Sequence, residues 1–163
     1  MKRNTKILAA LSVTVAVAML LSFIESRLPT FVPIPGVKLG LANVAVIFAM
    51  YKLGEGPAAG VSLVRVGLSA LLFGSVASLI YSLSGAVLSF ALMVLSRRVF
   101  KLHTVGVSII GGVAHNAGQI IAAAIVMGTA SIIYYLPFLI LSGTLAGIAI
   151  GLISNELTKR IKI

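Results

Sequence analysis

Residues 105–127 read VGVSIIGGVAHNAGQIIAAAIVM, a run that contains no Asp, Glu, Lys or Arg. As an α-helix the run would be about 34 Å long at 1.5 Å per residue, enough to cross the roughly 30 Å hydrocarbon core of a bilayer. Three polar side chains, His115, Asn116 and Gln119, lie close together near its middle. Polar groups at that depth need partners, because hydrocarbon offers them no hydrogen bonds. The stretch therefore predicts a membrane-spanning helix whose polar face meets protein or ligand.

Further apolar runs flank this one, and the whole chain is typical of a membrane protein. Hydrophobic residues make up 60% and charged residues 10% of the 163 positions, and the mean hydropathy is +1.16; soluble domains carry about 25% charged residues. A basic N-terminus before an apolar run is also typical of a signal peptide, but the first run is long enough to span and no small-residue cleavage pattern follows it. We predict an all-α integral membrane protein, a single domain over residues 1–163, with six transmembrane helices near residues 6–24, 39–51, 58–73, 75–95, 105–127 and 130–153.

The basic residues indicate how these helices are oriented. With six crossings, both termini share one side of the membrane with the connections after the second and fourth helices. Ten of the 13 Lys and Arg residues fall on that side, the opposite side holds Arg27 and Lys38, and Arg65 lies within the third helix. The positive-inside rule then places both termini in the cytoplasm, and the net charge of +10 belongs to helix ends rather than to a nucleic-acid surface. We expect the lipid bilayer to be a partner and nucleic acid not to be one.

Residue counts from the outer helix ends place several polar side chains at similar depth. Asn43 would lie about 6–8 Å below the outer boundary, Arg65 and Gln119 about 12 Å, and His115 about 18 Å. An arginine at mid-membrane costs at least about 2.5–3.5 kcal/mol on insertion scales, so it normally faces protein, water or a ligand. Together with a proline-rich loop after the first helix, this arrangement predicts an outward-facing pocket with a lid. The candidate substrate-binding residues are Glu25, Arg27, Lys38, Asn43, Arg65, His115, Asn116 and Gln119.

These residues also have structural interpretations. Arg65 could bind backbone carbonyls or Glu25, and Glu25 could instead pair with Arg27. Asn43 could simply bridge two helices. If the pocket exists, Arg65 and Lys38 favour an anionic or strongly polar ligand.

Small residues recur at helical spacing on two of the predicted helices. Gly143, Gly147 and Gly151 form a ridge on the last helix that favours close packing inside the bundle, with dimerisation as the alternative. On the first helix, small residues make two stripes of the kind that a membrane partner could use. The candidate partner-docking residues are Ala10, Ser12, Thr14, Ala16 and Ala18.

The residue inventory argues against an enzyme and against a metal or cofactor site. The chain has no Cys and no Asp, and its three acidic residues, Glu25, Glu55 and Glu156, are far apart in the sequence. Metal-diphosphate chemistry needs clustered carboxylates, and a catalytic triad needs an acid or a thiol beside the histidine. There is no P-loop either, so any ATP hydrolysis would come from another chain.

Several motifs resemble a known family. They are PGVKLGLAN at residues 35–43, AHNAGQ at 114–119, and Arg65 followed by LLFG at 71–74 and YSLSG at 81–85. The sequence resembles, over nearly its whole length, the Gx transporter family, also labelled heptaprenyl diphosphate synthase component I. That family is grouped with the substrate-binding (S) components of energy-coupling factor (ECF) transporters. The resemblance implies a six-helix bundle in the bacterial cytoplasmic (inner) membrane, a pocket capped by the loop between helices one and two, and a transmembrane coupling protein and ATPases as partners.

We therefore expect a non-catalytic, S-component-like protein that captures a small polar or anionic molecule from outside. One alternative is a membrane subunit linked to isoprenoid or quinone metabolism, in which an apolar groove holds a prenyl tail and Arg65 or Lys38 a polar head. Another alternative is a structural scaffold, in which the polar side chains at mid-membrane form hydrogen bonds only with one another.

Overall fold

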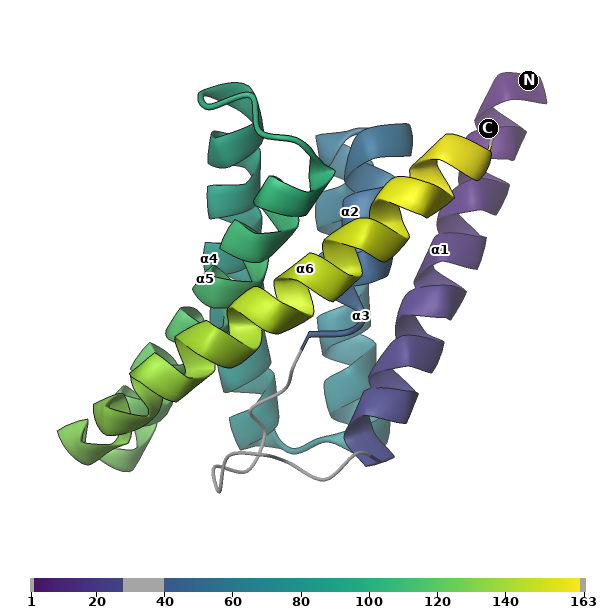
Figure 1. Cartoon of the computed structure of the whole chain (residues 1–163). Helices are drawn as coiled ribbons and strands as arrows, with labels where there is room; N and C mark the ends of the chain where they lie inside the picture. The colour runs from purple at the N-terminus through teal and green to yellow at the C-terminus, as the bar shows by residue number, and fades with distance from the viewer. Residues whose placement is uncertain (1, 28–39, 162–163) are drawn as a thin grey trace.

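The computed structural model describes residues 2–27 and 40–161, with residues 2–4 described as backbone alone, and within these ranges helices are joined by short turns and connections (Figure 1). The prediction of an all-α membrane protein with six helices is confirmed. A short 3₁₀ helix, η1, precedes the last α-helix. The elements are α1 (Lys2–Arg27), α2 (Asn43–Lys52), α3 (Glu55–Phe73), α4 (Val76–Arg98), α5 (Thr104–Met127), η1 (Ala130–Tyr135) and α6 (Leu136–Arg160).

Five helical segments are long and apolar enough to cross a membrane, which makes this a multi-pass membrane protein; the last of them, Ala130–Arg160, combines η1 and α6. The exception is α2, whose 10 residues span about 15 Å. It begins at Asn43 rather than near residue 39 because Gly40 has a positive φ of 86° and the carbonyl of Gly40 closes a turn onto the N–H of Asn43. The other boundaries predicted from the sequence differ from the observed ones by at most four residues, except that α6 ends at Arg160 instead of residue 153 and that residues 130–135 form η1.

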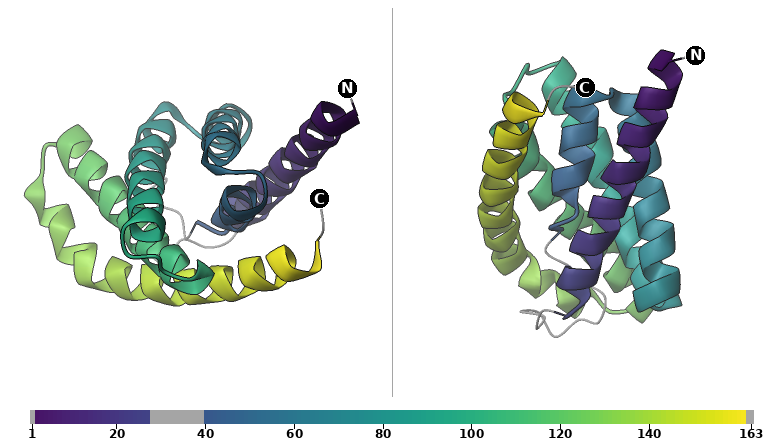
Figure 2. Two further views of the ribbon diagram at one scale, coloured as in Figure 1. Left: turned by 90° about the horizontal axis from the view of Figure 1, so that it is seen from above. Right: turned by 90° about the vertical axis from the view of Figure 1, so that its right-hand side faces the viewer.

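The chain passes back and forth between two ends of the bundle (Figures 1 and 2). Both termini lie at one end, together with the connections at residues 53–54 and 99–103, and α6 crosses the bundle obliquely. We call this end the basic end, because it carries Lys6, Lys52, Arg97, Arg98, Lys101, Lys159 and Arg160. The opposite end holds the last turn of α1 and the connection between α3 and α4. Which side of the membrane each end faces stays a prediction.

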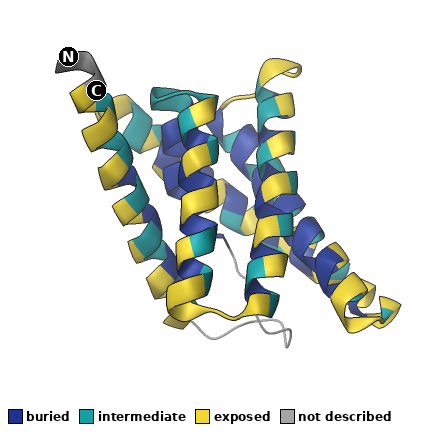
Figure 3. Ribbon diagram, turned by 180° about the vertical axis from the view of Figure 1, so that it is seen from behind, coloured by how far each residue is buried: buried dark blue, intermediate teal, exposed yellow. Residues whose placement is uncertain are grey.

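The core of the bundle forms around α2. Every residue of α2 from Asn43 to Met50 is buried, and the helix packs against α1, α3 and α6. The long helices instead expose apolar faces, as Leu71 and Ile125 illustrate with 83% and 76% of their surface exposed. Figure 3 shows these exposed faces on the outside of the bundle and the buried residues between the helices. An apolar outer surface of this extent fits contact with lipid.

Glycines bring α5 and α6 close together. A Cβ atom at Gly112 would collide with the carbonyl oxygen of Gly143, and one at Gly147 would lie 2.6 Å from Cα of Ile109. A Cβ at Gly151 would lie 2.7 Å from Cα of Val105. The predicted use of the α6 glycine ridge for packing within the bundle is therefore confirmed.

Candidate functional site

Arg65 lies near the middle of α3, buried with 3% of its surface exposed. Ser62 and Ser69, three residues before and four residues after it, are buried too, so this face of α3 is polar and turned into the bundle. Its Nε and Nη2 atoms have no hydrogen-bond partner within the part of the chain that the structure describes. Glu25 acts on the guanidinium electrostatically. Arg65 is thus a cation inside an apolar bundle with donor atoms to spare.

Glu25 lies in the last turn of α1 and holds the beginning of α2. Its Oε1 atom accepts hydrogen bonds from the N–H groups of Gly40 and Leu41. These groups precede α2 by one turn, so the carboxylate compensates the partial positive charge of that helix end. Glu25 is buried, with 6% of its surface exposed, and lies in the helix α1 rather than in the loop after it, so contact with a ligand stays a prediction beside this structural role.

Gly40 lies between two predicted site residues from different helices. A Cβ atom at Gly40 would lie 3.2 Å from Nδ2 of Asn43 and 3.9 Å from Cδ2 of His115. Both side chains are buried, at 5% and 2% exposure. Asn43 therefore lies close to His115, on the other side of Gly40.

Gly85 of α4 packs directly against the site face of α5. A Cβ atom there would lie 2.7 Å from the carbonyl oxygen of His115, 2.9 Å from Cγ of Gln119 and 3.1 Å from Cε1 of His115. Gln119 is fully buried. His115 and Gln119 are thus on one face of α5, as their spacing of four residues predicts.

Asn116 is turned away from this face, toward α6. Its Nδ2 atom donates to the carbonyl oxygen of Leu139 at 2.8 Å and to Oγ of Ser142 at 3.4 Å. Its Oδ1 atom has no hydrogen-bond partner among the described residues. The structure therefore separates Asn116 from His115 and Gln119, and its amide bridges two helices.

The remaining predicted lid residues lie outside this group. Arg27 is exposed at the end of α1, where its guanidinium lies 5.1 Å from the ring of Phe23. The Phe23 ring in turn lies 5.2 Å from Phe73 of α3. Lys38 is outside the described residues, and its predicted role stays a prediction.

Three features of the site were not identified as site features from the sequence. Gly40 and Gly85 belong to the motifs at residues 35–43 and 81–85 but were not predicted as site residues, because no local sequence pattern shows that a glycine will contact another helix. Ser62 and Ser69 carried a readable signal, because their spacing from Arg65 places them on the same helix face.

The candidate docking residues on α1 face two ways. Thr14 and Ala18 are buried against the bundle and Ala10 is half-buried, whereas Ser12 and Ala16 are exposed. The predicted docking surface is untested, and only the Ser12–Ala16 stripe is free for contact from outside the bundle.

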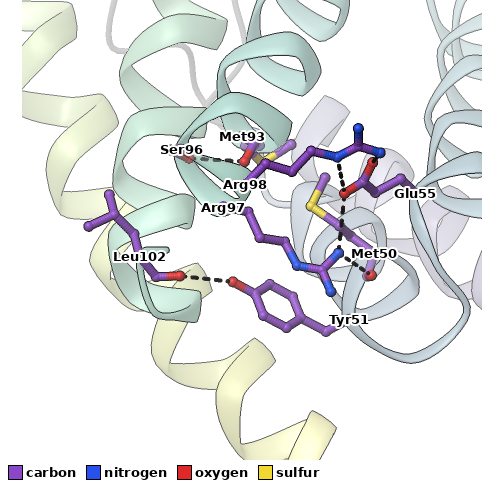
Figure 4. Close-up of polar contacts among 8 residues, drawn as sticks. All are labelled: Met50, Tyr51, Glu55, Met93, Ser96, Arg97, Arg98 and Leu102. Atoms are coloured by element: carbon purple, nitrogen blue, oxygen red, sulfur yellow. Dashed lines mark hydrogen bonds and ion pairs between the residues drawn. The ribbon is translucent and has the colours of Figure 1, made fainter. Parts of the chain in front are cut away.

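A second charged cluster lies at the basic end and joins α2, α3 and α4 (Figure 4). Arg97 donates from Nη1 to the carbonyl oxygen of Met50 at 3.0 Å, lies 4.7 Å from the centre of the Tyr51 ring and approaches Oε1 of Glu55 at 3.6 Å. Arg98 binds both oxygens of Glu55, through Nε at 3.1 Å and through Nη2. Charged side chains thus hold both ends of α2, a carboxylate at its beginning and a guanidinium at its end, each matching the helix dipole.

An apolar groove of about 290 Å³ lies between α4 and α5. Its lining includes Ile121 and Ile125, both exposed on the outer face of the bundle. The complete lining is Ile80, Ser84, Leu88, Gly118, Ile121, Ala122, Ile125 and Val126.

Comparison with family models decides which group of proteins this is. The model described as heptaprenyl diphosphate synthase component I matches residues 14–157, nearly the whole chain. This protein belongs to that family. Neither the curated proteins nor the solved structures gave a significant match. The family is named for a component of a synthase, and the resemblance on the quoted motifs is confirmed at this level.

Proposed function

We propose that this protein is a membrane substrate-binding component of an uptake transporter, which captures a small polar or anionic molecule. The observation that carries the proposal is Arg65, a guanidinium at mid-helix with 3% exposure and two donor atoms without a partner among the described residues. A buried charge is costly unless it is paired and hydrogen-bonded, so an arginine left in this state indicates a place for a ligand.

Glu25, which acts electrostatically on Arg65, links this arginine to a group of buried polar side chains and so supports a site rather than an isolated charge. Glu25 from α1, Asn43 from α2 and His115 from α5 are all buried, and they meet at Gly40. A group of polar side chains drawn from several helices, in the interior of a bundle with an apolar outside, is the usual architecture of a binding site between helices.

The charge distribution favours entry from outside. The basic end carries nearly all Lys and Arg residues of the described chain, so the positive-inside rule predicts that it faces the cytoplasm. Glu25 lies two residues before the end of α1 at the opposite end. The site then lies nearer the outer face, where a substrate-binding component meets its ligand.

We expect no catalysis by this chain. Glu55 pairs with arginines at the basic end and Glu156 pairs with Lys159 and Arg160, so neither carboxylate joins Glu25 in a metal-diphosphate site. With no P-loop in the sequence, transport would draw energy from a coupling protein and ATPases, the partners that the family resemblance implies.

The test is native mass spectrometry of the protein purified in mild detergent, with Arg65→Lys and Arg98→Lys compared. The wild type and Arg98→Lys should retain a small-molecule adduct that Arg65→Lys loses, because only the first substitution touches the site. An adduct retained equally by all three proteins contradicts the proposal.

A second function is favoured by the apolar groove between α4 and α5. Its volume of about 290 Å³ would take part of a prenyl or acyl chain, and the family is named for a prenyl diphosphate synthase component. The protein would then be a non-catalytic membrane subunit of isoprenoid or quinone metabolism. Copurification separates the two functions, since an ATPase module supports transport and a prenyl synthase supports the alternative.

A further inference from the structure

The protein contains its own example of how an arginine binds an oxyanion. Arg98 holds Glu55 side-on, with Nε donating to Oε1 at 3.1 Å and Nη2 donating to Oε2 (Figure 4). This edge of the guanidinium presents two parallel N–H groups whose spacing matches the two oxygens of a carboxylate or two oxygens of a phosphate.

Arg65 has the same edge unused. Its Nε and Nη2 atoms are the two donors without a hydrogen-bond partner among the described residues, and its side chain is 97% buried, as the 3% exposure implies. Arg98, by contrast, is exposed and its edge is filled by protein. Of the two, the buried arginine is thus the one whose Nε and Nη2 atoms have no acceptor among the described residues, which is the reverse of what burial requires.

We propose that this edge of Arg65 binds an oxyanion group of the ligand, a carboxylate or a phosphate, in the side-on geometry that Arg98 uses for Glu55. The inference rests on the proposed function and specifies the class of substrate. A ligand group with two neighbouring oxygens, such as a carboxylate or a phosphate, satisfies both donors at once, whereas a hydroxyl or a carbonyl oxygen satisfies one of them well.

The charges around Arg65 leave room for an added anion. The Glu25 carboxylate is already hydrogen-bonded through Oε1 to Gly40 and Leu41 at the beginning of α2, and that helix end carries a partial positive charge of about +0.5. His115 on α5 lies next to Gly40 and adds a second polar side chain. Among the described groups of this region, the negative charge of the Glu25 carboxylate is thus set against the positive charge of the Arg65 guanidinium and the partial positive charge at the beginning of α2.

The test measures thermal unfolding of the full chain in detergent, with sodium acetate or sodium phosphate against sodium chloride at equal ionic strength. At about ten times its dissociation constant, the bound anion should raise the Tm of the wild type by about 3–6 °C relative to chloride. Arg65→Gln should show no such shift. Arg65→Lys keeps the charge but lacks the two-nitrogen edge, so it should show less than half of the wild-type shift and serves if Arg65→Gln fails to fold. Arg98→Lys is the matched control and should keep the full shift.

A shift of equal size in Arg65→Lys and the wild type, or no shift of the wild type with either anion, overturns the oxyanion assignment. Native mass spectrometry distinguishes a failure of the oxyanion assignment from a failure of the proposed substrate-binding function. An uncharged adduct that depends on Arg65 leaves the substrate-binding function standing without the oxyanion, and no adduct at all removes both.

Discussion

Replacement of Gly85 by alanine tests the contact that shapes the site most directly. The new Cβ atom would lie 2.7 Å from the carbonyl oxygen of His115, and ordinary contacts begin near 3.4 Å, so α4 and α5 must separate by about 0.7 Å. A backbone oxygen cannot rotate away as a flexible side chain can. Overpacking of this kind costs about 1–3 kcal/mol, against about 0.5–1 kcal/mol gained from alanine in a helix interior. We expect a net loss of about 1–2 kcal/mol in the free energy of unfolding.

Gly67→Ala is the matched control for this measurement. Gly67 also lies inside a helix, α3, but a Cβ atom there has no neighbour within 4 Å. This variant should be stabilised by about 0.5–1 kcal/mol, so the two variants differ by the overpacking cost alone. Because the chain has no tryptophan, unfolding in mixed micelles of mild detergent and dodecyl sulfate is best followed by circular dichroism. Equal stability of the two variants would refute the close approach of α4 and α5 at Gly85.

Three other predictions follow from contacts at the helix ends and from the charge asymmetry. Glu25→Ala should lose about 2 kcal/mol more of the free energy of unfolding than Glu25→Gln, because glutamine keeps an oxygen that accepts a hydrogen bond from the N–H of Gly40 before α2. Equal losses in the two variants, measured by circular dichroism, would contradict this capping role. Arg97→Gln should lower the free energy of unfolding by about 1–2 kcal/mol in the same assay, because it removes a hydrogen bond to the end of α2 and a cation–π contact. A loss below about 0.5 kcal/mol would show that Arg97 contributes no more than an ordinary surface charge. The chain has no cysteine, so single cysteines can report the orientation. Ser131→Cys should react with a membrane-impermeant maleimide in intact cells, whereas His103→Cys should react only after the cells are permeabilised. The reverse pattern would contradict the predicted orientation.

Features of the fold that depend on hydropathy and spacing could be predicted from the sequence. The long apolar runs predicted the helices, because a membrane-spanning segment has few other ways to form all the hydrogen bonds of its backbone N–H and C=O groups. The spacing of His115 and Gln119 placed them on one face, and the residue count put Arg65 in the interior of α3. The glycine ridge of α6 packs inside the bundle as its spacing indicates.

Features that depend on contacts between distant residues could not be predicted. Glu25 caps α2 only because Gly40, fifteen positions later, has a positive φ and turns its N–H group toward α1. Asn116 follows His115 directly, yet one step of about 100° around the helix turns it to α6. The start of α2 at Asn43 depends on the same turn at Gly40, which hydropathy does not register.

The central claim is that Arg65 receives a ligand inside the bundle. A crystal structure from a lipidic mesophase, of protein purified with whatever it retains, tests it most directly at the Nε and Nη2 atoms of Arg65. The account predicts density for a small molecule with two acceptor atoms within hydrogen-bond distance of that edge. An edge bonded only to protein groups or to water would contradict it, and Arg65 would then be a structural cation.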